Sequence, residues 1–273
     1  MAAKKRKPKP HGFHRGVQKP EQAGDARSPR SAPGSSGRFW LYGLHAARAA
    51  LTNPKRKVLR AVLTARAAAE IGPTLLHRIA VETSDTDPVS RLLPSGSVHQ
   101  GVALLCEPLP ALDLEDLLAG TPSPRIVAVL DQITDPQNEG AILRSAAAFG
   151  VAAVIVQERH APPESGALAK AASGALDLVP RIEVVNIARA LEELGRLGFW
   201  RIALAADGNE PLADATRAGD LAIVLGAEGS GLRRLVRERC DTSAVLPTRG
   251  PMESLNVSNA AAIAFYELSR QKT

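Results

Sequence analysis

Three loops, each following an apolar stretch, carry most of the side chains that could bind a ligand or take part in catalysis. The first follows the run Ile126–Leu130 and contains Asn138, and the second follows Leu221–Leu225 and contains Glu228. The third loop spans residues 246–259, near the C-terminus. Short apolar strands separated by helices predict a parallel sheet, which binds ligands where the carboxyl ends of its strands meet the loops. The sequence therefore predicts that a functional site lies in these loops.

Arg144 lies among alanines in a predicted helix, Ala141–Phe149. Burying a guanidinium in so apolar a helix is costly unless an anionic group meets it. Asn138 precedes Arg144 by six residues, a spacing that does not place two side chains on one helical face. Two interpretations stay open. Either Asn138 lies in the loop and Arg144 reaches back toward it, or Asn138 caps the helix and Arg144 pairs with a surface carboxylate.

The second loop contains Gly226, Gly229 and Gly231, whose lack of a Cβ lets the backbone approach a ligand closely. Their spacing differs from the dinucleotide fingerprint G-x-G-x-x-G, and the sequence contains no P-loop Gly-Lys-Ser/Thr. This makes a nucleotide-dependent dehydrogenase a poor match. We favour a loop that binds another kind of ligand, with a phosphate site and a plain helix start as the alternatives.

The third loop precedes a predicted helix, Leu255–Arg270. Ser254 is a candidate N-cap, the ordinary role of a serine before an apolar helix. Asn256, Ser258 and Asn259 make the first turn more polar than a cap requires. They suggest the rim of a site.

The elements that must position these loops alternate regularly from Ile126 onward. The predicted strands are Ile126–Asp131, Ala152–Val156, Ile202–Ala206, Leu221–Leu225 and Ser243–Leu246, and the predicted helices are Ala141–Phe149, Ser165–Ser173, Ile187–Leu197, Leu232–Arg239 and Leu255–Arg270. This alternation predicts an α/β fold with helices on both faces of a parallel sheet over residues 125–273.

The first part of the chain is predicted to contain three regions. Residues 1–37 are basic and rich in Pro, Gly and Ser, and we expect a disordered tail that either tracks RNA phosphates or only improves solubility. Residues 38–107 resemble a small α/β domain, with helices at Leu44–Leu51 and Ala65–Ile71 around the strand Val58–Thr64 and a closing strand at 97–106. Proline-rich residues 108–124 are predicted to be a linker with a short helix at 112–118.

Composition excludes some classes of protein. Residues 1–37 hold nine Lys and Arg against two acidic residues, a net charge of +7. Since the whole chain has a net charge of +6, the remaining residues sum to about −1 and are close to neutral. The high pI therefore says little about what the body of the protein binds. No apolar run reaches the roughly 20 residues of a membrane span, and the basic N-terminus lacks the apolar segment of a secretory signal. Cys106 and Cys240 lack C-x-x-C spacing, which favours reduced thiols in a cytoplasmic protein.

Taken together, the three loops resemble the three motifs of the SpoU-type, or TrmH-like, RNA 2′-O-ribose methyltransferases of the SPOUT superfamily. The motifs are Asn138-x-Gly140-x-x-x-Arg144-x-Ala146, Gly226-Ala-Glu228-Gly229-x-Gly231 and Ser254-Leu-Asn256-Val-Ser258, in that order. Tyr42-Gly43-Leu-His45-Ala and Val98-His99-Gln100-Gly101 are similar to the substrate-recognition domain of the branch that methylates a guanosine of bacterial 23S ribosomal RNA. Glu139 departs from the family pattern, where an apolar residue is more common, and Asn259 is also unusual.

The resemblance implies a parallel sheet whose C-terminal segment forms a deep trefoil knot, and a homodimer that completes the site. It implies that S-adenosylmethionine binds in the knot and donates a methyl group to a ribose 2′-hydroxyl, with no metal. The cofactor contacts it implies are Gly226, Leu246, Leu255, Leu225 and Gly231, and the catalytic residues are Arg144, Asn138, Glu228, Ser254 and Asn256.

Family proposals make Arg144 a base, but an arginine side chain keeps its proton in proteins. We therefore expect its guanidinium to grip an RNA phosphate and stabilise the developing alkoxide. Two alternatives remain, a transfer-RNA methyltransferase and a non-catalytic RNA-binding ribosome assembly factor. The presence of Asn138, Arg144 and the glycine loop in one chain argues against a non-catalytic factor, which has no reason to retain all three.

Overall fold

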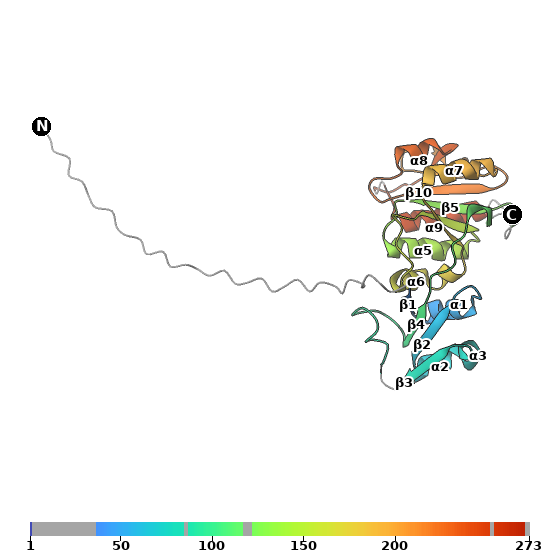
Figure 1. The fold of residues 1–273 in the computed structure, drawn as a ribbon. Helices are drawn as coiled ribbons and strands as arrows, with labels where there is room; N and C mark the ends of the chain where they lie inside the picture. Colours follow the sequence, from blue (N-terminus) through green and yellow to red (C-terminus); the bar gives the residue numbers. More distant parts are fainter. Residues whose placement is uncertain (2–36, 85–86, 117–121, 252–253, 271–273) are drawn as a thin grey trace. The chain divides into compact units, whose positions relative to one another are not determined.

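The structure, a computed structural model, describes residues 37–84, 87–116, 122–251 and 254–270, together with Met1. The predicted tail, the end of the predicted 112–118 helix and part of the third loop lie outside these residues. The described residues from Gly37 onward belong to one compact unit with two β-sheets (Figure 1). None of their helices is long and apolar enough to cross a membrane.

The first sheet has four strands in the order β1-β4-β2-β3, and we call residues 38–107, which contain it, the small unit. Its elements are β1 (Phe39–Tyr42), α1 (Leu44–Thr52), β2 (Val58–Thr64), α2 (Ala65–Ile71), α3 (Pro73–Leu76), β3 (Ala80–Ser84) and β4 (Val102–Cys106). Strand β4 runs antiparallel to β1 and β2, whereas β2 and β3 are parallel. The bounds of β2 and α2 match the sequence prediction. Strands β1 and β3 were not predicted, because β1 has only four residues and β3 is a largely exposed edge strand.

The second sheet has seven strands, all parallel, in the order β7-β6-β5-β10-β8-β11-β9. Its strands are β5 (Ile126–Asp131), β6 (Ala153–Gln157), β7 (Arg181–Val184), β8 (Trp200–Leu204), β9 (Glu210–Pro211), β10 (Leu221–Gly226) and β11 (Thr242–Val245). The helices are α5 (Pro136–Ala148), α6 (Gly166–Ala172), the 3-10 turn η1 (Ala175–Asp177), α7 (Ile187–Arg196), α8 (Arg234–Glu238) and α9 (Val257–Arg270). The predicted parallel α/β architecture is confirmed. The short strands β7 and β9 were missed, and most other bounds differ by one or two residues.

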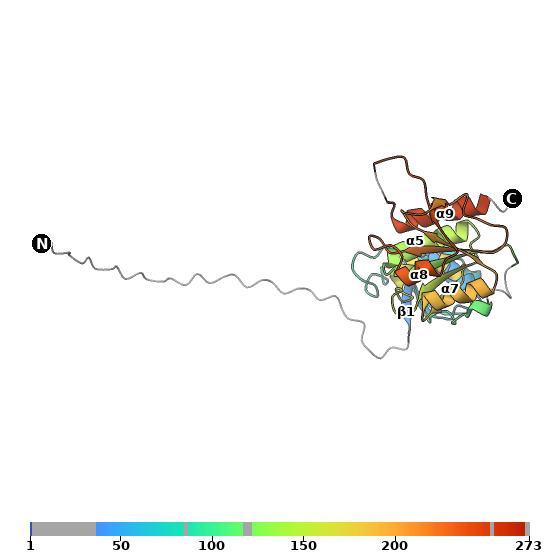
Figure 2. The same ribbon diagram turned by 90° about the horizontal axis from the view of Figure 1, so that it is seen from above.

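Helices cover both faces of this sheet. Alternate residues of β5 contribute to two different cores: Ile126, Ala128 and Leu130 join the core that contains α5, α6 and α9, whereas Val127 and Val129 pack with α7 and α8. Figures 1 and 2 show α9 running beside α5, and Figure 1 shows α7 and α8 on the opposite side of β5 and β10. Because the central strands β5 and β10 are covered on both faces, their residues are apolar, except for Asp131 at the end of β5.

The first loop is shorter than predicted, because α5 begins at Pro136 instead of Ala141. Asp135 is the N-cap and accepts a hydrogen bond from the backbone N of Gln137 at 3.0 Å, and proline suits the first helical position. Gly140 does not break the helix. It lies where α5 meets α6, and a Cβ on it would be 2.4 Å from the Cβ of Ala171.

The start of α9 also differs from the prediction. The helix begins at Val257, and the Oδ1 atom of Asn256 accepts a hydrogen bond from the backbone N of Ser258 at 2.9 Å. Asn256 is therefore the capping residue. The prediction of Ser254 as the N-cap was wrong by two residues, because several polar side chains here can cap a helix and the sequence does not decide between them.

Candidate active site

A hydrogen-bonded cluster joins the three loops. Asn138, in the first turn of α5, donates from Nδ2 to Oε1 of Glu228 at 3.3 Å. Asn256 donates from its own Nδ2 to Oδ1 of Asn138 at 3.1 Å and to Oε1 of Glu228. The same Glu228 oxygen accepts from the backbone N of Val257 at 3.3 Å, at the start of α9. The structure therefore brings together Asn138, Glu228 and Asn256, whose loops are far apart in the sequence.

A cavity of about 370 Å³ lies beside this cluster. Six of the predicted site residues line it, namely Leu225, Gly226, Glu228, Leu246, Ser254 and Leu255. The other lining residues come from the ends of β8 and β11 and from α9, namely Leu204, Ala205, Ala206, Val245, Pro247, Thr248, Val257 and Ala260. The end of β8 was not predicted as part of the site, because Leu204 to Ala206 carry no polar side chain that could mark it.

The glycines of the second loop have different structural roles. The second loop folds back on itself, so that Gly226 lies against the backbone of Gly231. A Cβ on Gly226 would be 2.3 Å from the carbonyl carbon of Gly231. Gly231 has φ +64° and donates from its backbone N to the carbonyl of Ala227 at 2.9 Å. Gly231 is not among the cavity-lining residues. Its position instead closes the loop that shapes the wall at Gly226.

The cavity fits S-adenosylmethionine, which the family resemblance implies. Its walls at Leu225, Leu246 and Leu255 are apolar and suit the flat adenine ring. The side chain of Glu228 at the rim suits a positively charged group. The close approach at Gly226 leaves backbone groups accessible to the ligand.

Arg144 is placed differently from both sequence interpretations. It is exposed, so the argument from the cost of burial was wrong. It lies on α5 six residues after Asn138, roughly 9 Å farther along the helix axis and on another side of it. Within the described residues, the side chain of Arg144 has no hydrogen bond or ion pair and does not line the cavity. A single chain therefore does not bring Arg144 to the cluster.

Glu139, which departs from the family pattern, forms a buried ion pair with Arg181, a residue that was not predicted from the sequence. Its side chain is fully buried and pairs with Nε of Arg181, on β7, at 2.6 Å. Burial raises the pKa of Glu139 above its ordinary value, while the Arg181 guanidinium opposes that shift. Arg181 also donates to Glu183 and, at 2.9 Å, to the carbonyl of Pro162. The pair fixes the first turn of α5, which carries Asn138.

A second buried carboxylate anchors the glycine loop. Asp131, at the end of β5, is fully buried and accepts from the backbone N and Nε of Arg233 at 3.0 and 2.8 Å. Arg233 also donates to the side chain of Gln157, at the end of β6, at 2.8 Å. In the sequence, an aspartate at the end of the apolar run Ile126–Leu130 could have indicated this buried carboxylate, but nothing indicated that Arg233 is its partner.

Comparison with known proteins identifies the family of this chain. The model of the SpoU rRNA Methylase family matches residues 125–266. A 23S rRNA (guanosine-2′-O-)-methyltransferase RlmB of Vibrio vulnificus is 39% identical over 240 residues, covering 85% of this chain and 97% of that protein. The RlmB of Nitrosomonas europaea is 48% identical over 174 residues, covering 63% of this chain and 67% of that protein.

Solved structures support the same fold. The SpoU methyltransferase AviRb from Streptomyces viridochromogenes, in complex with AdoMet, superimposes with a TM-score of 0.73 at 23% identity. The match covers 86% of this chain and 91% of AviRb. With a family model that spans more than half of the sequence and relatives similar along most of their length, this chain belongs to the SpoU rRNA methylase family.

Proposed function

We propose that this protein is a cytoplasmic, S-adenosylmethionine-dependent methyltransferase that acts on a ribose 2′-hydroxyl of RNA. The observation that carries the proposal is the Asn138–Glu228–Asn256 cluster beside the cavity lined by Gly226 and Leu246. Polar groups that can orient a hydroxyl therefore lie next to a pocket that fits the methyl donor. S-adenosylmethionine, when bound, supplies a methyl group activated by the positive charge on sulfur.

The residues of this chain would orient the nucleotide and stabilise charge. Asn138 and Asn256 would position the ribose, with Glu228 fixing both amides. Ser254, which lines the cavity, would hydrogen-bond a bound ligand. Positioning of this kind supplies much of the rate in reactions between two bound groups. Arg144 would contact an RNA phosphate and the developing alkoxide as a cation that keeps its proton.

The substrate we propose is a guanosine of 23S ribosomal RNA. The likeness to RlmB of Vibrio vulnificus extends over 97% of that protein and so includes the small unit of this chain. We infer that the small unit, residues 38–107 with the linker 108–124 after it, recognises the RNA, and that residues 125–273 carry the methyltransferase site. The basic tail over residues 1–37 would add contacts to phosphates.

We also propose that the C-terminal segment forms a deep trefoil knot. Strand β11 lies beyond β8, yet the following helix α9 returns to contact β10 and α5. The chain between them passes next to the glycine loop, where Asn256 bonds Glu228. A chain that crosses back in this way can thread the loop, which is rare among folds.

Arg144 leads to the proposal of a homodimer with a shared site. Helix α9, packed on α5, exposes two large apolar side chains, Ile263 at 45% and Tyr266 at 50%. We infer that a second copy covers this face and that Arg144 of one subunit completes the cavity of the other. This arrangement would give a partner to an arginine that is exposed and distant from its own cluster.

Mixed dimers test the function and the sharing together. Arg144→Ala should keep S-adenosylmethionine affinity but lower turnover by at least about 100-fold, the typical effect of removing one charge-stabilising donor. Leu246→Arg should block the cavity. Co-refolding the two inactive variants should restore about one quarter of wild-type activity, because half of the dimers would then contain one intact site.

The outcomes separate the alternatives. No recovery in the mixture means that Arg144 acts within its own subunit, and normal turnover by Arg144→Ala overturns its assigned role. Arg144→Lys keeps the charge but loses the planar fork, so a large loss there favours phosphate gripping. Wild-type protein that binds no S-adenosylmethionine by calorimetry would instead support a non-catalytic RNA-binding factor.

A further inference from the structure

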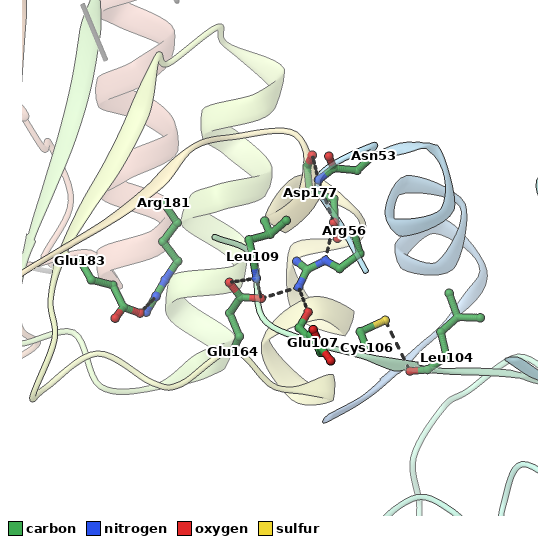
Figure 3. Close-up of polar contacts among 10 residues, drawn as sticks. All are labelled: Asn53, Arg56, Leu104, Cys106, Glu107, Leu109, Glu164, Asp177, Arg181 and Glu183. Carbon is green, nitrogen blue, oxygen red and sulfur yellow. Dashed lines mark hydrogen bonds and ion pairs between the residues drawn. The ribbon is translucent and has the colours of Figure 1, made fainter. Parts of the chain in front are cut away.

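Arg56 is the middle residue of the basic turn between α1 and β2, but unlike its neighbours Lys55 and Lys57 it is buried. Its guanidinium donates from Nε to Oδ1 of Asp177 at 2.7 Å and from Nη1 to Oε2 of Glu164 at 2.6 Å (Figure 3). The side chain of Arg56 is fully inaccessible to solvent. A buried cation with two carboxylate partners is costly to desolvate, so its position calls for a structural explanation.

The partners of Arg56 come from outside the small unit. Asp177 ends the η1 turn and Glu164 precedes α6, whereas Arg56 and Asn53 belong to the small unit. Asn53 donates from Nδ2 to the carbonyl oxygen and Oδ1 of Asp177 at 3.2 and 3.1 Å. Figure 3 shows Arg56 pointing from the small unit toward both carboxylates. The cluster therefore ties the α1–β2 turn to the α6–η1 segment.

The same cluster holds the chain that leaves the small unit. Arg56 donates from Nη1 to the backbone carbonyl of Glu107 at 3.1 Å, directly after β4. The carboxylate of Glu164 accepts from the backbone N of Leu109 at 3.3 Å. The beginning of the predicted linker is therefore fixed at its first residues.

Backbone packing extends this junction along α6. A Cβ on Gly166 would lie 2.3 Å from the carbonyl oxygen of Trp40 in β1, and a Cβ on Gly174 would lie 3.0 Å from the Cβ of Ala49 in α1. Between them, Lys170 donates from Nζ to Oε1 of Gln100 at 2.8 Å. Residues 166–177 thus contact the small unit along their whole length.

The apolar core is also continuous across the junction. Leu41, Ala46 and Ala47 of the small unit belong to the same buried cluster as Leu168 and Ala172 of α6. An apolar contact of this kind resists independent motion of the parts it joins. Burial lowers the pKa of Arg56, but the hydrogen bond to Asp177 and the charges of Glu164 and Asp177 raise it overall, so the cation is retained.

We propose that Arg56 is a positioning residue that locks the small unit onto the α6–η1 segment, so that the two parts present RNA with one rigid surface. The reasoning about RNA rests on the proposed function, whereas the docking itself does not. Two binding surfaces held at a fixed separation engage one ligand at high effective concentration, and loosening them weakens binding without changing either surface. The lock should therefore act on the KM for RNA and not on S-adenosylmethionine affinity.

The test compares Arg56→Met with a matched control, Arg60→Met. Arg60 also pairs with a carboxylate, Glu82, but both residues lie within the small unit. Spin labels on Val81→Cys in β3 and Leu235→Cys in α8, both exposed positions, report the distance between the two parts. Labelled protein is diluted with excess unlabelled protein so that only distances within one chain are measured.

A narrow distance distribution is expected for the wild type and for Arg60→Met, and a distribution at least about twice as wide for Arg56→Met. The KM for a 23S RNA fragment should rise at least about tenfold in Arg56→Met, with S-adenosylmethionine affinity within about twofold of wild type. A distribution as narrow as wild type with an unchanged KM overturns the proposal.

If Arg56→Met does not fold, Asp177→Asn removes the opposite charge with little change in shape and is measured in the same way. If the wild-type protein methylates no RNA, the proposed function fails, but the distance measurement still decides whether Arg56 locks the two parts together.

Discussion

Replacing Arg181 by methionine should destabilise the protein strongly, and by an amount that depends on pH. Methionine replaces the unbranched aliphatic stem of Arg181 but not its guanidinium. Glu139 is then left without its ion-pair partner at a site that solvent does not reach. Breaking a buried pair by removing one partner costs about 3–5 kcal/mol. This is a large part of the roughly 5–15 kcal/mol that stabilises a typical domain.

The pH dependence follows from the carboxyl group that remains. The pKa of Glu139 is already raised in the folded protein, chiefly by burial, with the charges of Glu183 and Glu164 adding to it and Arg181 opposing it. Without Arg181 it should rise further. When the pKa of a carboxyl group is higher in the folded than in the unfolded protein, the unfolded state loses the proton first. The free energy of unfolding then falls as the pH rises from the unfolded-state pKa to the folded-state pKa. The destabilisation of Arg181→Met should therefore be larger at pH 8 than at pH 5.

Urea unfolding at pH 5 and pH 8 measures this difference directly. Glu139→Gln should cost less, because Arg181 keeps Glu183 and the carbonyl of Pro162 as partners. The double variant Arg181→Met with Glu139→Gln should lose the pH dependence while remaining foldable. Equal destabilisation of Arg181→Met at both pH values would refute the reasoning, because it would mean that Glu139 is not ionised in the wild type.

Two other predictions concern the glycine loop and the thiols. Gly226→Ala should weaken S-adenosylmethionine binding at least about tenfold and cost about 1–3 kcal/mol, since its Cβ would overlap backbone atoms of the returning loop. Gly250→Ala, where a Cβ meets nothing within 4 Å, is the control in calorimetry, and equal effects would contradict the prediction. Burial raises the pKa of Cys106 and of Cys240 to about 12, so neither thiol should react with Ellman's reagent at pH 8 until the protein is denatured. Rapid reaction of the native protein would contradict this.

The local patterns of the sequence determined much of the methyltransferase half. The apolar run Ile126–Asp131 predicted β5 with its observed bounds, and the helices of this half were found near their positions. These predictions succeed because periodicity and apolar runs reflect burial of one segment at a time. The start of α5 was missed, since Pro136 and Gly140 were taken as breakers although proline is favourable at the first helical position.

The sequence named candidate site residues but did not give their geometry. The motifs named Asn138, Glu228 and Asn256 through the family resemblance, and the structure joins them by hydrogen bonds across 90 and 118 residues of sequence. Arg144 was expected to contact an RNA phosphate, and that role stays a proposal; what the sequence did not predict is that Arg144 is exposed on another side of α5, away from the cluster of its own chain. Six residues along a helix fix the direction of a side chain only when the helix bounds are known.

Tertiary structure alone decided which charges are paired and buried. The sequence showed Glu139 as an unusual residue and Arg56 as part of a basic turn, without indicating that Arg181 and Asp177 are their partners. Arg56 and Asp177 are 121 residues apart, so no local pattern relates them. A buried ion pair depends on how separate elements come together in the folded chain, whereas a strand or a helix is written into consecutive residues.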